Sequence, residues 1–277
     1  MIDITILLGI ILAAGVVRGY SGFGFSALVL LSGSLLVAPQ ALVPVLYLLE
    51  IVGGAAMLYA GGLGAVRWAL LLPLMGGSVL AIPLGQWLLA GSDASLVMVI
   101  AGAAVALFCL LLWRGFALPH TPHRAATFAV GMTSGALNGL GSLGGLPIAT
   151  YLLATRQSPE QLRGTLAMLV VIVDGYSFAS ASWFGLVDAQ TWRLAALALP
   201  ALGLGFWLGH RLFLRSDPAR FRRVLLLLLA TLALLHPLRH LGGPLLASAA
   251  LCPAAPRAGL VGGATGRCAP HGERADG

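Results

Sequence analysis

The most telling shortage in this 277-residue chain is charge. Only 9% of the residues are Asp, Glu, Lys or Arg, whereas 59% are hydrophobic. A soluble globular domain carries about 25% charged residues, so this composition excludes that class. The chain also lacks a GxxxxGK[ST] motif and any His-containing metal motif. We therefore do not expect it to hydrolyse ATP itself, and we expect neither a metal nor another cofactor.

Lysine is absent, and cysteine is scarce. All sixteen basic residues are arginine, and most of them lie in short loops between apolar runs. This placement is what membrane topology requires, so the net charge of +7 does not indicate a nucleic-acid partner. The three cysteines give no disulfide framework, because their number is odd.

Long apolar runs take the place of charge. Uninterrupted runs of roughly 18 or more apolar residues predict membrane-spanning helices. The apolar N-terminus has no basic residues before it, so we interpret it as the first membrane segment and not as a cleaved signal. We predict an all-α, polytopic membrane protein in contact with a lipid bilayer. Full spans are expected at 41–60, 68–90, 95–113, 164–184, 192–213 and about 219–237.

The chain repeats its own pattern. GVVRGYSGFGF (15–25) aligns with GALNGLGSLGG (135–145) at an offset of 120 (135 − 15), and Trp68 aligns with Trp192 at an offset of 124 (192 − 68). One small insertion explains both offsets, and residues related by them are called repeat mates below. This internal duplication decides the expected architecture. We predict a first transmembrane repeat at 1–118, a second at 119–240, and a disordered tail at 241–277.

Each repeat opens with an interrupted apolar segment, 4–17 with 23–37 and 125–137 with 146–154. If each segment is a hairpin that leaves the membrane on the side it entered, ten loop arginines lie on one side and two on the other. With single spans the split is seven to five, so hairpins fit the positive-inside rule better. Hairpins give about eight membrane segments, arranged as two inverted four-segment repeats. The first segment of each repeat is then broken and re-entrant, and both termini lie outside the cytoplasm. Inverted repeats with broken helices are typical of secondary transporters.

The interruptions contain residue types that bind anions. A helix that begins inside the membrane presents free N–H groups, and Arg18 adds a charged, planar donor fork. The alternatives are close helix packing for the glycines and an interfacial position for Arg18. We predict one pocket between the two interruptions. The expected substrate-binding residues are Arg18, Gly19, Ser21, Gly22, Gly24, Asn138, Gly139, Ser142, Gly144 and Gly145.

Two acidic residues lie inside predicted spans. Glu50 and Asp174 are repeat mates at the offset of 124 (174 − 50). Because acids within membrane segments often mark proton pathways, both are candidates for proton coupling. The alternative is a structural hydrogen bond or a pairing with an arginine, for which Arg18 is a possible partner.

These motifs resemble the sulfite exporter TauE/SafE family of membrane permeases. The likeness rests on RGYSGFGF near the N-terminus and on GALNGLGSLGGLPIATYLLAT in the second half, and it covers about residues 5–237. It implies transport of small sulfur-containing or organic anions, such as sulfite, thiosulfate or sulfonates, across the bacterial inner membrane. The family's first glycine run is often denser than SGFGF, so Phe23 and Phe25 either narrow the pocket or face lipid.

We therefore predict a secondary transporter of small anions and not an enzyme. One alternative is an intramembrane enzyme such as a lipid-phosphate phosphatase, which would need Arg18, Ser21 and Glu50 to cluster. No second acid lies near them in the sequence. The other alternative is a structural membrane protein without a transported substrate. The intramembrane charges argue against it, because burying them costs free energy.

Overall fold

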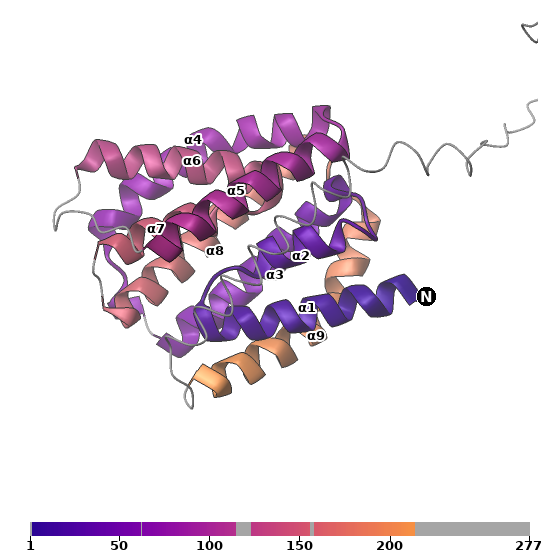
Figure 1. Ribbon diagram of the computed structural model, residues 1–277, viewed down its shortest axis with the longest axis horizontal. Coiled ribbons are helices and arrows are strands. Elements are labelled where there is room, and N and C mark those ends of the chain that lie inside the picture. The colour runs from indigo at the N-terminus through magenta and orange to yellow at the C-terminus, as the bar shows by residue number, and fades with distance from the viewer. Residues whose placement is uncertain (1, 62, 115–122, 156–157, 214–277) are drawn as a thin grey trace, which may run out of the picture. The chain divides into compact units, whose positions relative to one another are not determined.

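The computed structural model describes residues 2–61, 63–114, 123–155 and 158–213, and these ranges contain helices and no strand. They belong to the unit Met1–Gly242, and the predicted tail lies outside the described residues. The first half contains α1 (Ile2–Ser21), α2 (Phe25–Gly33), α3 (Pro39–Gly61), the short 3-10 helix η1 (Leu63–Ala65), α4 (Trp68–Gly91) and α5 (Ala94–Arg114). The second half contains α6 (Arg124–Gly141), α7 (Gly145–Ala154), α8 (Pro159–Trp183) and α9 (Ala189–Phe213) (Figure 1).

Six of the described helices, α1, α3, α4, α5, α8 and α9, are long and apolar enough to cross a membrane. Five of them coincide with expected full spans, and the sixth expected span, 219–237, lies outside the described residues. The prediction for α1 was wrong, because this helix does not end at residue 17 but continues to Ser21. Its 20 residues extend about 30 Å at the helical rise, which is enough to span a bilayer.

The interruptions are narrower than expected. α1 and α6 each run four residues further than predicted (21 − 17 and 141 − 137), so that only residues 22–24 and 142–144 separate the paired helices. The helix bounds also recur at the offset of 120, because α2 and α7 begin at residues 25 and 145, and α3 and α8 at residues 39 and 159. This recurrence supports the predicted duplication.

Both interrupted segments fold back on themselves. In the first half, a Cβ atom on Gly33 would lie 3.1 Å from Cδ1 of Leu7, so the end of α2 lies beside the start of α1. In the second half, the hydroxyl groups of Thr127 on α6 and Tyr151 on α7 are 2.6 Å apart. Residues this far apart along one continuous helix could not meet, so each segment is a helix hairpin. Whether each hairpin returns to the membrane face that it entered stays a prediction.

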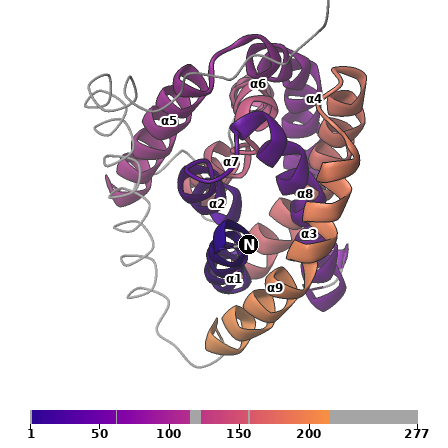
Figure 2. The ribbon, with the colours of Figure 1, turned by 90° about the vertical axis from the view of Figure 1, so that its right-hand side faces the viewer.

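The two halves pack against each other in a matching pattern. α1 packs on α9, and α6, the counterpart of α1, packs on α4, the counterpart of α9 (Figure 2). Glycines bring both pairs into close contact. A Cβ atom on Gly19 would overlap the carbonyl oxygen of Phe206, and one on Gly139 would overlap that of Ile82. These contacts are the close helix packing that small residues permit in membranes.

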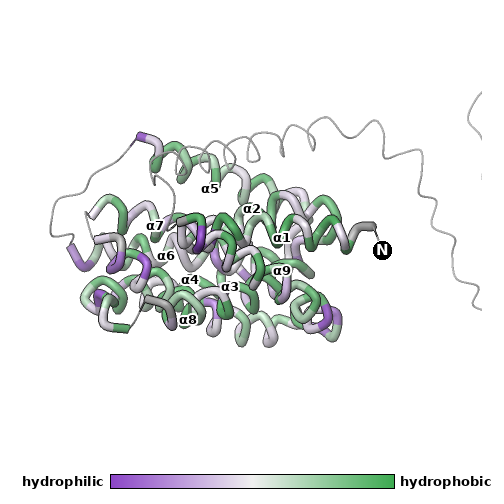
Figure 3. Tube along the Cα trace, turned by 90° about the horizontal axis from the view of Figure 1, so that it is seen from below, coloured by the Kyte–Doolittle hydropathy of each residue, from purple (hydrophilic) through white to green (hydrophobic). Residues whose placement is uncertain are grey.

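Apolar residues cover the helices along most of their length, and the hydrophilic residues gather mainly at helix ends (Figure 3). Large side chains such as Leu80, Trp87 and Trp113 are exposed, which suits a surface surrounded by lipid. The interior contains the opposite residue type, because Arg18, Glu50 and several hydroxyl groups are buried there. Because the charged residues lie inside and the apolar residues outside, the candidate site is in the interior of the helix bundle.

Candidate functional site

The two interruptions meet at one cavity, which is lined by residues of α1, α2, α3, α6, α7 and α8. The structure therefore brings together residues that are as far apart in the chain as Arg18 and Asp174. Nine of the twelve predicted site residues line this cavity. They are Arg18, Gly22, Gly24, Glu50, Asn138, Ser142, Gly144, Gly145 and Asp174.

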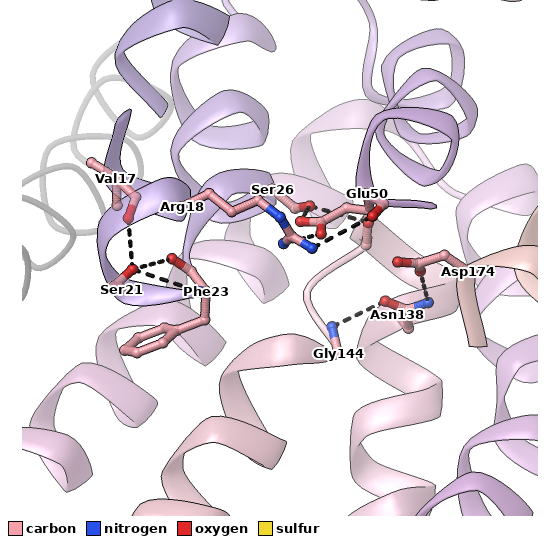
Figure 4. Close-up of polar contacts among 10 residues, drawn as sticks. Val17, Arg18, Ser21, Phe23, Ser26, Glu50, Asn138, Gly144 and Asp174 are labelled. Carbon is pink, nitrogen blue, oxygen red and sulfur yellow. Dashed lines mark hydrogen bonds and ion pairs between the residues drawn. The ribbon is translucent and has the colours of Figure 1, made fainter. Parts of the chain in front are cut away.

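Three predicted site residues are not among those that line the cavity. Gly19 and Gly139 lie within α1 and α6, at the helix contacts described above. The Ser21 hydroxyl lies 2.8 Å from the carbonyl oxygens of both Val17 and Phe23, and it accepts a hydrogen bond from the Phe23 N–H at 3.3 Å (Figure 4). This geometry assigns Ser21 to the turn that leads out of α1. A side chain that bonds its own backbone in this way commonly ends a helix.

Arg18 reaches from the last turn of α1 into the cavity, where it forms an ion pair with Glu50 of α3 (Figure 4). The Arg18 side chain is only 2% exposed. Gly53, three residues beyond Glu50 on α3, makes room for it, because a Cβ atom there would lie 2.8 Å from Nε of Arg18. The pairing with Arg18, one of the alternatives considered for Glu50, is thus confirmed. It offsets part of the cost of burying either charge alone.

The second half has a counterpart to this ion pair, in which a neutral asparagine takes the place of the arginine. Asn138 donates through Nδ2 to Oδ1 of Asp174 at 2.7 Å and to the Ser177 hydroxyl at 3.0 Å. Its own Oδ1 accepts from the Gly144 N–H at 3.2 Å. Asp174 is 3% exposed, and the ion pair of Arg18 is with Glu50. Asp174 is therefore a buried acid held by an amide.

Ser26 connects the two interruptions and was not among the residues predicted from the sequence. Its hydroxyl donates to Oε1 of Glu50 at 2.5 Å and lies 3.2 Å from the Ser142 hydroxyl. Ser26 occupies the first turn of α2, where helix geometry leaves the backbone N–H groups without intrahelical partners. A signal for it existed, because it is a hydroxyl residue that follows the break directly and precedes an apolar run.

Tyr47 was also missed, and it supports the second interruption from the first half of the chain. Its side chain is fully buried, and its hydroxyl lies 2.8 Å from the carbonyl oxygen of Asn138 and 3.1 Å from that of Gly139. These carbonyls are in the last turn of α6, and the Asn138 carbonyl also accepts from the Ser142 N–H at 2.7 Å. Tyr47 stands three residues before Glu50, on the same face of α3. That spacing was the available signal.

Ser142 has an unusual backbone conformation. Its φ of 55° is left-handed, and it is the only non-glycine residue with a positive φ in the part of the chain that the structure describes. Its repeat mate is Gly22 (142 − 120), which has a φ of 84°. Glycine adopts this conformation at lower cost than serine. A strained residue with a buried hydroxyl in a cavity points to a role for its side chain.

Comparisons with known proteins agree with the resemblance noted in the sequence. The model of the family described as "Sulfite exporter TauE/SafE" matches residues 7–235. A protein of Cupriavidus necator named "Probable sulfite/organosulfonate exporter TauE" is 25% identical over 215 residues, which cover 74% of this chain and 82% of that protein. No solved structure matches the chain.

Proposed function

Because this chain belongs to the sulfite exporter TauE/SafE family, we propose that it moves small sulfur-containing or organic anions across the bacterial inner membrane. It is a multi-pass membrane transporter and not an enzyme, so the phosphatase alternative falls away. Sulfite, thiosulfate and sulfonates are the proposed substrate class. The name of the Cupriavidus necator relative, a probable sulfite and organosulfonate exporter, supports this class.

The observation that carries the proposal is the buried arginine at the helix interruption. Arg18 lies in the cavity, and its guanidinium can hold two oxygens of an oxyanion at once. α2 and α7 both begin at the cavity, and their first N–H groups add partial positive charge. The substrate path then runs between the two interruptions. We assign substrate binding to Arg18, Gly22, Gly24, Asn138, Ser142, Gly144 and Gly145.

Glu50 and Asp174 are the proposed proton carriers. Both are buried and both line the same cavity as Arg18. Acids placed in this way within membrane segments serve as proton relays in pumps and transporters. A proton on Glu50 would release Arg18 from its ion pair, and this would couple proton binding to anion binding.

The proposed arrangement in the membrane is two inverted repeats with both termini outside the cytoplasm. The exchange of partners between the α1–α9 and α4–α6 pairs supports two related halves. The arginine bias supports the orientation. Single cysteines placed in the loop 114–124 should react only with reagents that reach the cytoplasm. Labelling from the outside would overturn this topology.

The experiment that tests the function is efflux of labelled sulfite from proteoliposomes. Thiosulfate, sulfoacetate, acetate and phosphate serve as competitors, and Arg18→Ala is measured alongside the wild type. Saturable flux that disappears in the variant is the expected result, and the competitors then rank the substrates. Absence of flux for every anion in the wild type would contradict the proposed substrate class.

A further inference from the structure

The Glu50 carboxylate lies where an oxyanion would be expected to bind. One of its oxygens, Oε2, pairs with the Arg18 guanidinium, and the other, Oε1, accepts from the Ser26 hydroxyl at 2.5 Å. A cationic fork and a hydroxyl donor are also the groups that recognise a bound anion. The protein's own acid therefore occupies a site with the chemistry of a substrate site.

A third hydrogen-bond donor lies next to this site, and it has no carboxylate oxygen as a partner. The Ser142 hydroxyl is 3.2 Å from the Ser26 hydroxyl, and this is its only hydrogen-bond partner among the described residues. A carboxylate has two oxygens, and Arg18 and Ser26 already engage both. A third oxygen on the same central atom would have Ser142 as its donor. The strained φ of Ser142, where its repeat mate is glycine, favours a role that needs the hydroxyl.

The room in the cavity limits how such an anion could enter. About 30 Å³ is open beside Glu50, which is enough for about two water molecules. Because Glu50 already engages Arg18 and Ser26, an anion can bind to both donors only when the Glu50 carboxylate leaves. The charged residues that line the cavity within the described ranges are Arg18 on α1, Glu50 on α3 and Asp174 on α8.

We propose that the Glu50 carboxylate is an internal competitor of the substrate, and that an anion with three oxygens on one atom replaces it. In this complex Arg18, Ser26 and Ser142 each hold one oxygen. The inference rests on the proposed function and deepens it, because it names the group that the site selects. Ser142 then distinguishes sulfonate-type anions from carboxylates, which have only two oxygens to offer.

The test compares methanesulfonate with acetate, two monoanions that share a methyl group and differ in their number of oxygens. Their binding to the purified full-length protein in nanodiscs is measured by calorimetry for wild type and Ser142→Gly. Glycine suits the left-handed backbone at this position, so the variant is expected to fold. Methanesulfonate should bind about 10- to 100-fold more weakly to the variant, as for a lost hydrogen bond to a charged group. Acetate affinity should stay the same.

Equal weakening of both anions, or no weakening of either, would overturn the selection by Ser142. Binding of neither anion to the wild type, together with absence of sulfite flux, would instead contradict the proposed function. The two failures are therefore distinguishable. Ser182→Ala, which removes an exposed hydroxyl on α8, is the control for a serine outside the cavity.

Glu50→Gln tests the competition directly. If Glu50 occupies the site in about nine molecules of ten, its removal should tighten methanesulfonate binding about tenfold. The variant leaves Arg18 buried without its anion, which destabilises the fold, and methanesulfonate should therefore raise its unfolding temperature more than that of the wild type. Unchanged or weaker binding together with an equal temperature shift would show that Glu50 does not compete for the site.

Discussion

The two halves of the cavity use the same three positions with different residues. In the first half Arg18 meets Glu50, with Gly53 beside them. Their repeat mates are Asn138 (18 + 120), Asp174 (50 + 124) and Ser177 (53 + 124), which are joined by hydrogen bonds. The long arginine is accommodated by a glycine, and the short asparagine is met by a serine. The positive charge of the first half therefore has no counterpart in the second.

This difference separates two chemical tasks. The first half has a cation whose acid partner can be exchanged for a substrate anion. The second half has an acid held by a neutral amide, so it can gain or lose a proton without breaking an ion pair. If both halves had kept an arginine at this position, two buried cations would lie close together, which costs free energy. The comparison therefore assigns the cation that attracts the anion to the first half, and to the second half the acid that can exchange a proton while every ion pair stays intact.

The largest effect is expected from making the first half like the second. Arg18→Asn removes the guanidinium, and we expect sulfite flux in proteoliposomes to fall at least about 100-fold, because two hydrogen bonds to a charged group are lost. Arg18→Lys should recover only part of the flux, since a lysine lacks the planar fork. Flux at wild-type affinity in Arg18→Asn would show that this arginine does not bind the substrate.

Gly53 provides the next test, because it makes the room that Arg18 needs. A Cβ atom in Gly53→Ala would lie 2.8 Å from Nε of Arg18, so the guanidinium must shift. We expect flux to fall about tenfold or more, as is typical when a binding group is displaced by about 1 Å. The control is Gly175→Ala on α8, where no atom outside the helix lies within 4 Å. Equal flux in the two variants would contradict the role given to Gly53.

Asp174→Asn should affect the pH dependence of transport more than anion affinity. The variant keeps the shape of the side chain and removes its proton-binding group. We expect the flux to depend less on pH, with anion affinity unchanged or raised because no acid remains beside Asn138. The control is Asp93→Asn, which replaces an exposed acid before α5. Unchanged pH profiles in both Asp174→Asn and Glu50→Gln would contradict proton coupling.

Much of this architecture could be predicted from the sequence. The full spans followed from apolar run length, and the interruptions followed from the position of glycines in otherwise apolar segments. The exact ends of α1 and α6 could not be predicted, because Gly19 and Gly139 remain helical to permit contact with a neighbouring helix. A helix-packing glycine and a chain-breaking glycine look alike in a sequence. Only the tertiary contacts distinguish them.

The site was predictable where residues carried charge and less so where they carried a hydroxyl. Arg18, Glu50 and Asp174 stand out because charge is rare in a membrane segment. Ser26 and Ser177 do not stand out, since serine is common in membrane helices and acts here through neighbours 24 and 39 residues away. Those partners follow from the helix hairpins and the packing of α8. One sequence contains no direct record of such contacts.

The smallest expected effect concerns a support that only the second interruption has. Tyr47 donates to two carbonyls in the last turn of α6, whereas its repeat mate, Val171 (47 + 124), cannot donate a hydrogen bond. In Tyr47→Phe, the loss of this bond should lower stability by about 1 kcal/mol, or about 2–4 °C in the unfolding midpoint. The matched control is Tyr59→Phe, because the Tyr59 side chain is 95% exposed.

Transport distinguishes a general loss of stability from a specific effect on the second interruption. Tyr47 bonds the last turn of α6, and Asn138 in that turn donates to Asp174. Tyr47→Phe should therefore also shift the pH profile of flux, in the same direction as Asp174→Asn but by less. Arg18 does not depend on this contact, so the affinity for methanesulfonate should stay at the wild-type value. A fall in affinity with an unchanged pH profile would mean that the two halves do not divide anion and proton binding in this way.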